Sequence, residues 1–164
     1  MEAEIQLFSD VYIERITQLI NKTNQFNVTT KRYTVTEIES IAVSKSSIPL
    51  YGKLIDKFGD NGLVSILIGE LQGDKCLIDT FLMSCRVLKR DMEFAMLDVL
   101  VEQCRKRNVN EIFGTYTRTP KNSMVANLYS EFGFELIESQ GEDFSSWKLS
   151  LKNYIKKKIT IKIN

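Results

Sequence analysis

Histidine is absent from this chain of 164 residues. Imidazole is the general base in Ser-His-Asp and Cys-His catalysis and a frequent zinc ligand, so its absence excludes single-chain versions of both mechanisms and argues against a zinc site. Cysteine is scarce: Cys76, Cys85 and Cys104 are odd in number and scattered along the chain. This pattern predicts reduced thiols in a cytoplasmic protein rather than a disulfide framework.

An excess of one charge is also lacking, because 22 lysines and arginines face 21 aspartates and glutamates. No global field therefore favours nucleic acid or a membrane surface. No apolar run approaches the roughly 20 residues of a membrane-spanning helix, and no cationic-then-apolar leader opens the sequence. We expect one globular domain over residues 1–164, without nucleic-acid or membrane partners and without a metal.

Apolar periodicity predicts an alternation of strands and helices. The expected strands are Glu4–Phe8, Leu50–Phe58, Leu63–Leu71, Cys76–Cys85, Glu111–Thr117, Gly133–Glu138 and Phe144–Leu151. Two helices are expected before the second strand, the second of them behind a capping box at Thr34 and Glu37; a third begins at Met92. Asp60-Asn61-Gly62 predicts a hairpin turn, and the tail Lys156–Asn164 an edge strand or a frayed end.

The stretch Asn122–Phe134 predicts a fourth helix, followed directly by a strand. Its apolar residues Val125, Leu128, Tyr129 and Phe132 share one helical face, and Gly133 follows as a stop. An ordinary amphipathic helix has the same features. The stretch also resembles the fourth-helix signature of the GNAT acyltransferase superfamily, Asn-x-x-Ala-x-x-Leu-Tyr-x-x-x-Gly-Phe, with valine in place of alanine.

The order of the elements, β-α-α-β-β-β-α-β-α-β-β, is similar to that of the same superfamily. The resemblance implies an α/β GNAT fold with a central mixed, mostly antiparallel sheet and helices on both faces. It also implies that the sheet splays open between the fourth strand, ending at Cys85, and the fifth strand, Glu111–Thr117.

Three shorter stretches resemble the C-terminal half of FkbH-type proteins: Thr23–Asn27, Ile78–Leu88 and Thr119–Asn122. In that family a phosphatase-like (HAD) half precedes a GNAT-like half, and together they load a glyceryl unit onto an acyl carrier protein for methoxymalonate biosynthesis. The resemblance implies that the chain is a GNAT-like half, freestanding or preceded by such a HAD-type domain. It implies an acyl carrier protein as partner and a pantetheine thioester, on the carrier protein or as acetyl-coenzyme A.

The segment before the third helix departs from the GNAT pattern. GNAT enzymes hold the coenzyme A diphosphate in a loop Arg/Gln-x-x-Gly-x-Gly/Ala, where glycines allow close approach to a helix N-terminus. The corresponding segment Arg86–Glu93 has no glycine, and Asp91 and Glu93 add negative charge. These acids argue against coenzyme A, or they simply cap the helix. Lys89 and Arg90 are expected either to contact the phosphate or the acidic surface of a carrier protein, or to be solvated charges at the start of the helix.

The resemblance also assigns roles to single residues. Tyr129 is the candidate general acid for the leaving thiolate, or it is only a packed aromatic. Asn122 is an orienting hydrogen-bond donor or the helix N-cap. Cys85, beside Arg86, is an acyl-accepting thiolate or a small buried strand residue. The residues expected to contact the pantetheine thioester are Met83, Ser84, Cys85, Arg86, Val87, Leu88, Lys89, Arg90, Asp91, Met92 and Asn122.

The polar stretch Asn24, Gln25, Phe26 and Asn27 is the expected substrate site. Its amides donate and accept hydrogen bonds, which suits a hydroxylated acyl group, and Phe26 closes the pocket against water. Three functions remain open: acyl transfer from a pantetheine thioester, a non-catalytic module that docks a carrier protein, and coenzyme A-dependent N-acetylation.

Overall fold

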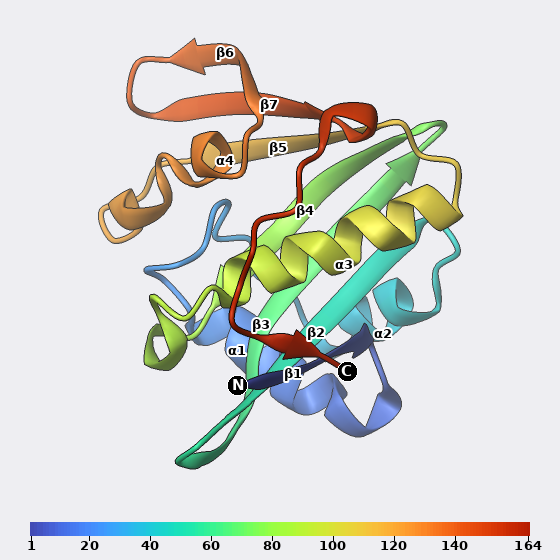
Figure 1. Ribbon diagram of the computed structural model, residues 1–164, viewed down its shortest axis with the longest axis vertical. Helices are drawn as coiled ribbons and strands as arrows, with labels where there is room; N and C mark the ends of the chain where they lie inside the picture. The colour runs from blue at the N-terminus through green and yellow to red at the C-terminus, as the bar shows by residue number, and fades with distance from the viewer.

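The protein, described here by a computed structural model of residues 1–164, is built on one eight-stranded sheet. The strands are β1 (Glu2–Leu7), β2 (Ser47–Asp56), β3 (Gly59–Gln72), β4 (Lys75–Met83), β5 (Glu111–Thr117), β6 (Glu135–Gln140), β7 (Phe144–Ser150) and β8 (Lys162–Ile163). They lie in the order β6-β7-β5-β4-β3-β2-β1-β8 (Figure 1). Only the pairs β4–β5 and β1–β8 are parallel, which confirms the mixed, mostly antiparallel α/β sheet.

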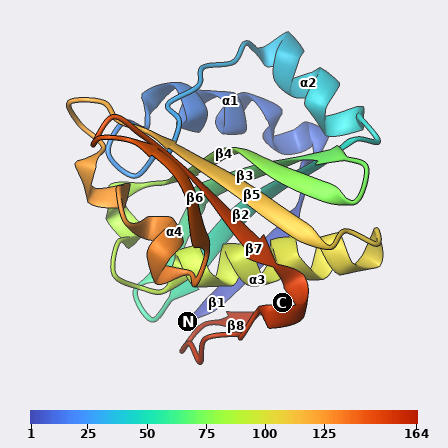
Figure 2. The same cartoon turned by 90° about the horizontal axis from the view of Figure 1, so that it is seen from above.

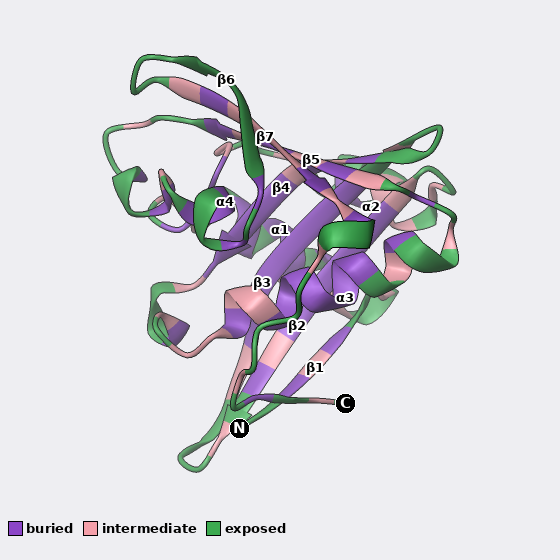
Figure 3. Ribbon diagram, turned by 45° about the horizontal axis from the view of Figure 1, so that its top comes forward, coloured by how far each residue is buried: buried purple, intermediate pink, exposed green.

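Helices cover both faces of the sheet, as predicted (Figure 2). The helices α1 (Ile13–Lys22) and α2 (Val35–Val43) lie on one face, and α3 (Met92–Lys106) and α4 (Leu128–Glu131) lie on the other. Apolar side chains of α1 and α2 form a cluster of 10 buried residues with β2, β3 and β4, and α3 and α4 belong to a larger cluster of 33. Burial is therefore concentrated in the central strands and in α3, whereas the edge strand β6 is exposed (Figure 3). No helix is long and apolar enough to cross a membrane.

The sheet splays open between β4 and β5. These strands pair only where Lys75–Ile78 of β4 meets Glu111–Gly114 of β5. Beyond that point the two strands continue to Met83 and Thr117 without pairing to each other. The predicted splay is confirmed.

The hairpin between β2 and β3 turns earlier than predicted. The chain reverses at Lys57-Phe58, where the Asp56 carboxylate accepts a hydrogen bond from the Phe58 amide at 2.8 Å. Asn61, predicted to lie in the turn, instead donates its side-chain amide to the Leu54 carbonyl at 3.3 Å within an irregular part of the ladder. An aspartate side chain that accepts a hydrogen bond from the backbone amide two residues later stabilises a turn by itself. This local contact places the chain reversal at Lys57-Phe58.

The predicted continuous fourth helix is wrong. A 3₁₀ turn at Ser123–Val125 is followed by Asn127 at φ −109°, ψ 13°, and only then by the four-residue α4. The predicted apolar face is nevertheless buried, including Val125 and Tyr129. Packing therefore decides the course of this segment more than helix continuity does.

The C-terminal tail crosses the outer face of α3 (Figure 1). The Tyr154 hydroxyl donates to the Asp98 carboxylate of α3, and β8 then pairs with β1. Of the tail Lys156–Asn164, predicted as an edge strand or a frayed end, only Lys162–Ile163 forms a strand, at the edge of the sheet. The tail ends beside the N-terminus, because the Lys162 amide donates to the Met1 carbonyl at 2.9 Å.

Candidate functional site: a groove at the mouth of the splayed strands

A groove of about 730 Å³ opens between the end of β4 and the connection from α1 to α2. We call it the β4–α1 groove. It is lined by Arg15, Leu19, Lys22, Thr23, Asn24, Gln25, Phe26, Met83, Ser84, Cys85, Arg86 and Lys121. The predicted substrate stretch and the predicted pantetheine-contacting strand end therefore meet at one surface.

The space between the splayed strands is filled by the chain itself. The Met83 amide of β4 donates to the Phe26 carbonyl at 3.0 Å, and the Val28 amide donates to the Phe81 carbonyl at 3.2 Å. On the other side the Thr117 amide of β5 donates to the Val28 carbonyl at 2.9 Å. The segment Phe26–Val28 thus bridges β4 and β5. The Met83 amide, which was expected to pair with a pantetheine arm, is already used in this conformation.

Two buried asparagines hold this bridging segment in place. The Asn27 side chain donates to the Thr23 carbonyl at 3.1 Å and accepts from the Thr30 amide at 2.9 Å. Asn122 donates at 2.9 Å both to the Asn27 carbonyl and to the Thr117 carbonyl. In this conformation Asn27 does not line the groove, because its side chain is buried and its polar atoms are bonded within the loop.

Asn122 is not the predicted side-chain cap of a helix. It occupies the position before the 3₁₀ turn, but its side chain makes no cap hydrogen bond. Its side-chain oxygen instead accepts from the Thr119 amide at 2.8 Å and from the Tyr116 hydroxyl at 3.2 Å. With its two donated bonds, Asn122 connects the end of β5 to the bridging segment.

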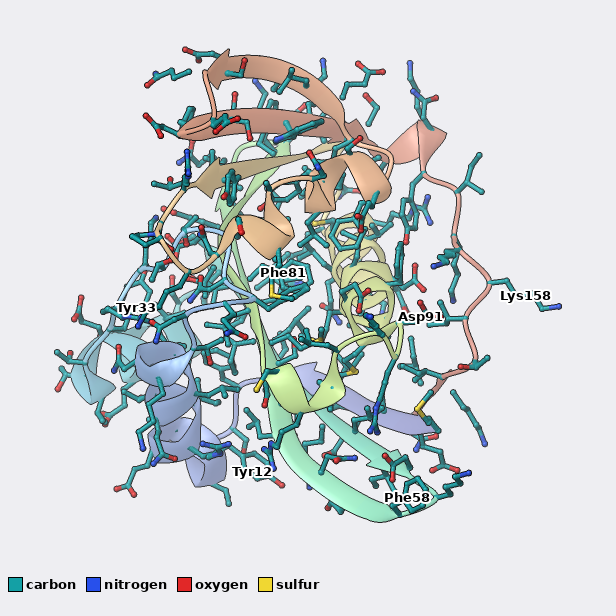
Figure 4. The ribbon with its side chains drawn as sticks, turned by 90° about the vertical axis from the view of Figure 1, so that its left-hand side faces the viewer. Tyr12, Tyr33, Phe58, Phe81, Asp91 and Lys158 are labelled. Carbon is teal, nitrogen blue, oxygen red and sulfur yellow. The ribbon has the colours of Figure 1, made fainter.

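Aromatic rings close the inner end of the groove. Phe26 packs edge-on against Phe81 at 6.0 Å between ring centroids, and Phe81 stacks on Phe132 at 5.9 Å. Figure 4 shows Phe81 in the interior of the molecule. Because Phe26 also lines the groove, it lies between this apolar interior and the groove.

Tyr129 does not reach the groove. Its side chain is 0% exposed and packs so closely on Gly114 that a Cβ there would lie 2.2 Å from the ring. Burial raises the pKa of the Tyr129 phenol, and the Thr115 backbone opposes this only in part. The Thr115 contact falls outside hydrogen-bond geometry, so the Tyr129 hydroxyl has no hydrogen-bond partner. In this conformation Tyr129 cannot deliver a proton to a ligand in the groove.

Cys85 lies exposed at the groove, whereas Cys76 and Cys104 are buried. The alternative that Cys85 is a small buried strand residue is therefore wrong. Arg86 is exposed beside it and donates its Nε hydrogen to the Ser84 hydroxyl oxygen at 3.3 Å.

Comparison with solved structures shows the fold. An Escherichia coli ribosomal-protein-S18-alanine N-acetyltransferase aligns with a TM-score of 0.68 at 11% identity, over 91% of this chain and 94% of that one. A GNAT-family acetyltransferase from Staphylococcus aureus Mu50 aligns with a TM-score of 0.69 at 14% identity, over 91% and 99%. The chain has the GNAT fold. A third GNAT-like neighbour, the PaiA N-acetyltransferase of Thermoplasma acidophilum solved with coenzyme A, gives 0.65 at 16% identity over 92% and 99%. No protein-family model matches the sequence, and neither does any curated protein.

Within this GNAT fold, the loop between β4 and α3 keeps glycine-like backbone angles without glycine. Lys89 and Asp91 both have φ 62°, in the left-handed region that side chains disfavour. The Arg90 guanidinium pairs with the Asp56 carboxylate and is not free for a phosphate. Val87 and Met92, both expected to contact pantetheine, are buried in the core, and Leu88 packs against it.

The acids at the start of α3 do not suit a coenzyme A diphosphate. Asp91, placed beside the start of α3 in Figure 4, is paired with Lys157 of the tail at 3.3 Å, and Lys157 lies 3.9 Å above the Phe94 ring. Burial raises the pKa of the Glu93 carboxyl, and one of its oxygens has no hydrogen-bond partner. A diphosphate here would meet two carboxylates, so the residues present do not fit it. No group of three cysteine, aspartate or glutamate side chains forms a metal site.

Five residues that line the groove were not predicted from the sequence, namely Arg15, Leu19, Lys22, Thr23 and Lys121. Arg15, Leu19 and Lys22 stand at i, i+4 and i+7 of α1, so helical spacing would have placed them on one face. Lys121 directly precedes the buried Asn122, within the stretch Thr119–Asn122 that the sequence analysis singled out, but no role was predicted for it there.

Proposed function

We propose that this protein is a GNAT-type acyltransferase that accepts an acyl group from a pantetheine thioester, with the acyl unit held in the β4–α1 groove. The observation that carries the proposal is the meeting of the end of β4 with the α1–α2 connection at the mouth of the splayed strands. The neighbouring structures support this reading through their fold, and their printed names describe N-acetyltransferases.

Cys85 is the residue proposed to take the acyl group. Its thiolate attacks the thioester carbonyl, the bond between that carbonyl carbon and the pantetheine sulfur breaks, and the departing thiolate takes a proton from water. The acyl group then passes from Cys85 to its acceptor. Among the thiols of the chain only Cys85 is exposed to a ligand.

The acyl unit is proposed to be hydroxylated, of glyceryl type, and to be carried on an acyl carrier protein. Asn24 and Gln25 line the groove, and each amide both donates and accepts hydrogen bonds. The Asn24 side-chain oxygen already accepts from Arg32, which leaves Gln25 as the freer hydrogen-bonding group. A carrier protein presents one phosphodiester, so it makes a smaller demand on the acidic β4–α3 loop than coenzyme A does.

Intact-protein mass spectrometry tests this proposal. The protein is mixed with a carrier protein loaded with a glyceryl thioester, and an adduct of the mass of the acyl group is expected, absent in Cys85→Ala. The matched variant Gln25→Ala should fold normally yet prefer a propionyl over a glyceryl thioester, because lost hydrogen bonds weaken only the hydroxylated substrate. An adduct on Cys85→Ala would disprove the role of Cys85.

A docking module without catalysis is a second candidate, favoured by the bridged splay and the buried Tyr129. It predicts that the holo carrier protein binds without any acyl transfer. Coenzyme A-dependent N-acetylation predicts transfer from acetyl-coenzyme A to an amine, and the acids Asp91 and Glu93 disfavour it.

A further inference from the structure

The β4–α1 groove has a one-sided charge, although the chain as a whole is nearly neutral. Four of its lining residues are cationic, Arg15, Lys22, Arg86 and Lys121, and no aspartate or glutamate lines it. The whole chain, by contrast, has a net charge of only +1. These four cations therefore make the groove locally positive.

None of these four cations takes part in an ion pair within the molecule. Some other basic residues are paired, among them Lys31 with Asp79, Arg90 with Asp56, and Lys157 with Asp91, whereas others, such as Lys158, are not. Lys22 lies in the last turn of α1, where a cation complements the helix dipole. That explanation does not extend to Arg86 and Lys121, which come from other parts of the fold.

Like charges around one hollow repel each other, and a concave surface concentrates their field. An anion in the groove relieves this repulsion, and a guanidinium can bind a carboxylate or a phosphate through two parallel hydrogen bonds. Arg15 and Arg86 supply two such groups, and the neutral amides of Asn24 and Gln25 leave the positive field unopposed.

We propose that the groove binds an anionic group, a carboxylate or a phosphate monoester, carried by the acyl unit or by its acceptor. That the anion belongs to the acyl unit or to its acceptor rests on the proposed function. That the groove binds an anion rests only on the charges of its lining residues.

Alkylation of Cys85 measures the field in the groove without requiring acyl transfer. Iodoacetate and iodoacetamide alkylate the same thiol, but only iodoacetate is an anion, and the buried Cys76 and Cys104 do not compete. We expect the ratio of the iodoacetate rate to the iodoacetamide rate at low salt to be about three- to tenfold higher for Cys85 than for a neutral cysteine amide. At about 1 M salt the ratio for Cys85 should fall towards the value for the neutral cysteine amide. A ratio equal to that of the free thiol at low salt overturns the proposal.

Neutralising single cations provides the matched comparison. Arg86→Gln and Lys121→Gln should each lower the rate ratio about twofold at low salt. Lys158→Gln is the control, because Lys158 is exposed on the tail and points away from the body of the molecule (Figure 4). An equal effect of all three variants would show that only net charge matters, which contradicts a local site.

Protection of Cys85 from iodoacetamide identifies the anion. Malonate, inorganic phosphate and phosphopantetheine are compared at matched ionic strength with potassium chloride. Protection by malonate supports a carboxylate on the acyl side, and protection by phosphate supports a phosphate there. Protection by phosphopantetheine alone means that the cations bind the pantetheine arm, which overturns the assignment of the groove to the acyl side. No protection by any of them overturns the proposal. A high rate ratio without acyl transfer would reject the proposed acyltransferase while leaving the anion site intact.

Discussion

Replacing Asn122 by alanine separates a structural from a catalytic role for this motif residue. The Asn122 side chain makes four hydrogen bonds, to Asn27, Thr117, Thr119 and Tyr116. Thr117 is exposed and Thr119 half-buried, so their backbone groups can bond to water instead. Asn27 and Tyr116 are buried, and each polar group left without a partner there costs about 1–3 kcal/mol.

We therefore expect Asn122→Ala to lower the free energy of unfolding by about 3–5 kcal/mol. For a chain of this size that corresponds to a fall in Tm of about 6–20 °C. The assay is urea denaturation followed by circular dichroism, with Tm as a second readout. Asn122→Asp should be at least as destabilising at neutral pH, because a carboxylate cannot donate to the carbonyls of Asn27 and Thr117.

The control is Asn127→Ala, a nearby exposed asparagine that makes no cap hydrogen bond. Its expected effect lies within about 0.5 kcal/mol. The reasoning is refuted if Asn122→Ala loses less than about 1 kcal/mol, the worth of one ordinary hydrogen bond, while abolishing acyl transfer. Asn122 would then serve the reaction and not the bridge between β4 and β5.

Three further predictions follow from buried or strained groups. Tyr129→Phe removes a hydroxyl without a hydrogen-bond partner, so urea denaturation should show a free energy of unfolding that is unchanged or raised by about 1 kcal/mol. If the variant instead loses acyl transfer about a hundredfold at unchanged stability, Tyr129 is the general acid after all. The double variant Lys89→Gly, Asp91→Gly should bind coenzyme A about tenfold more tightly by titration calorimetry, because it removes a carboxylate and two side chains from a helix N-terminus. Asn108→Gly, also at a left-handed position (φ 57°) but at the far end of α3, is its control and should leave coenzyme A binding unchanged. Burial raises the pKa of the Asp79 carboxyl, but hydrogen bonds from three side chains outweigh burial and hold it below the ordinary value. Its stabilisation is therefore present above the unfolded pKa of about 3.9 and is lost as the pH falls through the lower folded pKa, so Asp79→Asn should flatten the acid limb of stability below about pH 4. An unchanged acid limb in urea denaturation would contradict that assignment.

The sequence by itself determined the order of the elements and the chemistry of local contacts. The capping box at Thr34 and Glu37 is present in the structure with both of its hydrogen bonds. These contacts span three residues, a distance over which a sequence pattern and the backbone geometry are directly linked. Apolar periodicity likewise predicted the strands and the buried face that contains Val125 and Tyr129, because burial follows from side-chain spacing.

Local patterns failed where two local signals competed. Asn61-Gly62 is a strong turn sequence, yet Asp56 closed the hairpin first through its bond to the Phe58 amide. The missing glycines before α3 were visible in the sequence, whereas the left-handed angles of Lys89 and Asp91 were not. Backbone conformation at such positions is imposed by the elements that the loop joins, against the preference of the side chain.

Only the tertiary structure decided the candidate site. The bond between Asn122 and the Asn27 carbonyl joins residues 95 positions apart, and it gives two motif asparagines a structural role. The cationic groove combines Arg15 from α1, Arg86 from the 3₁₀ turn after β4 and Lys121 from beyond β5. Sequence spacing relates residues within one element, but the distance between charges on different elements is set by how the elements pack. For that reason the fold could be predicted from patterns along the chain, and the charge of the groove could not.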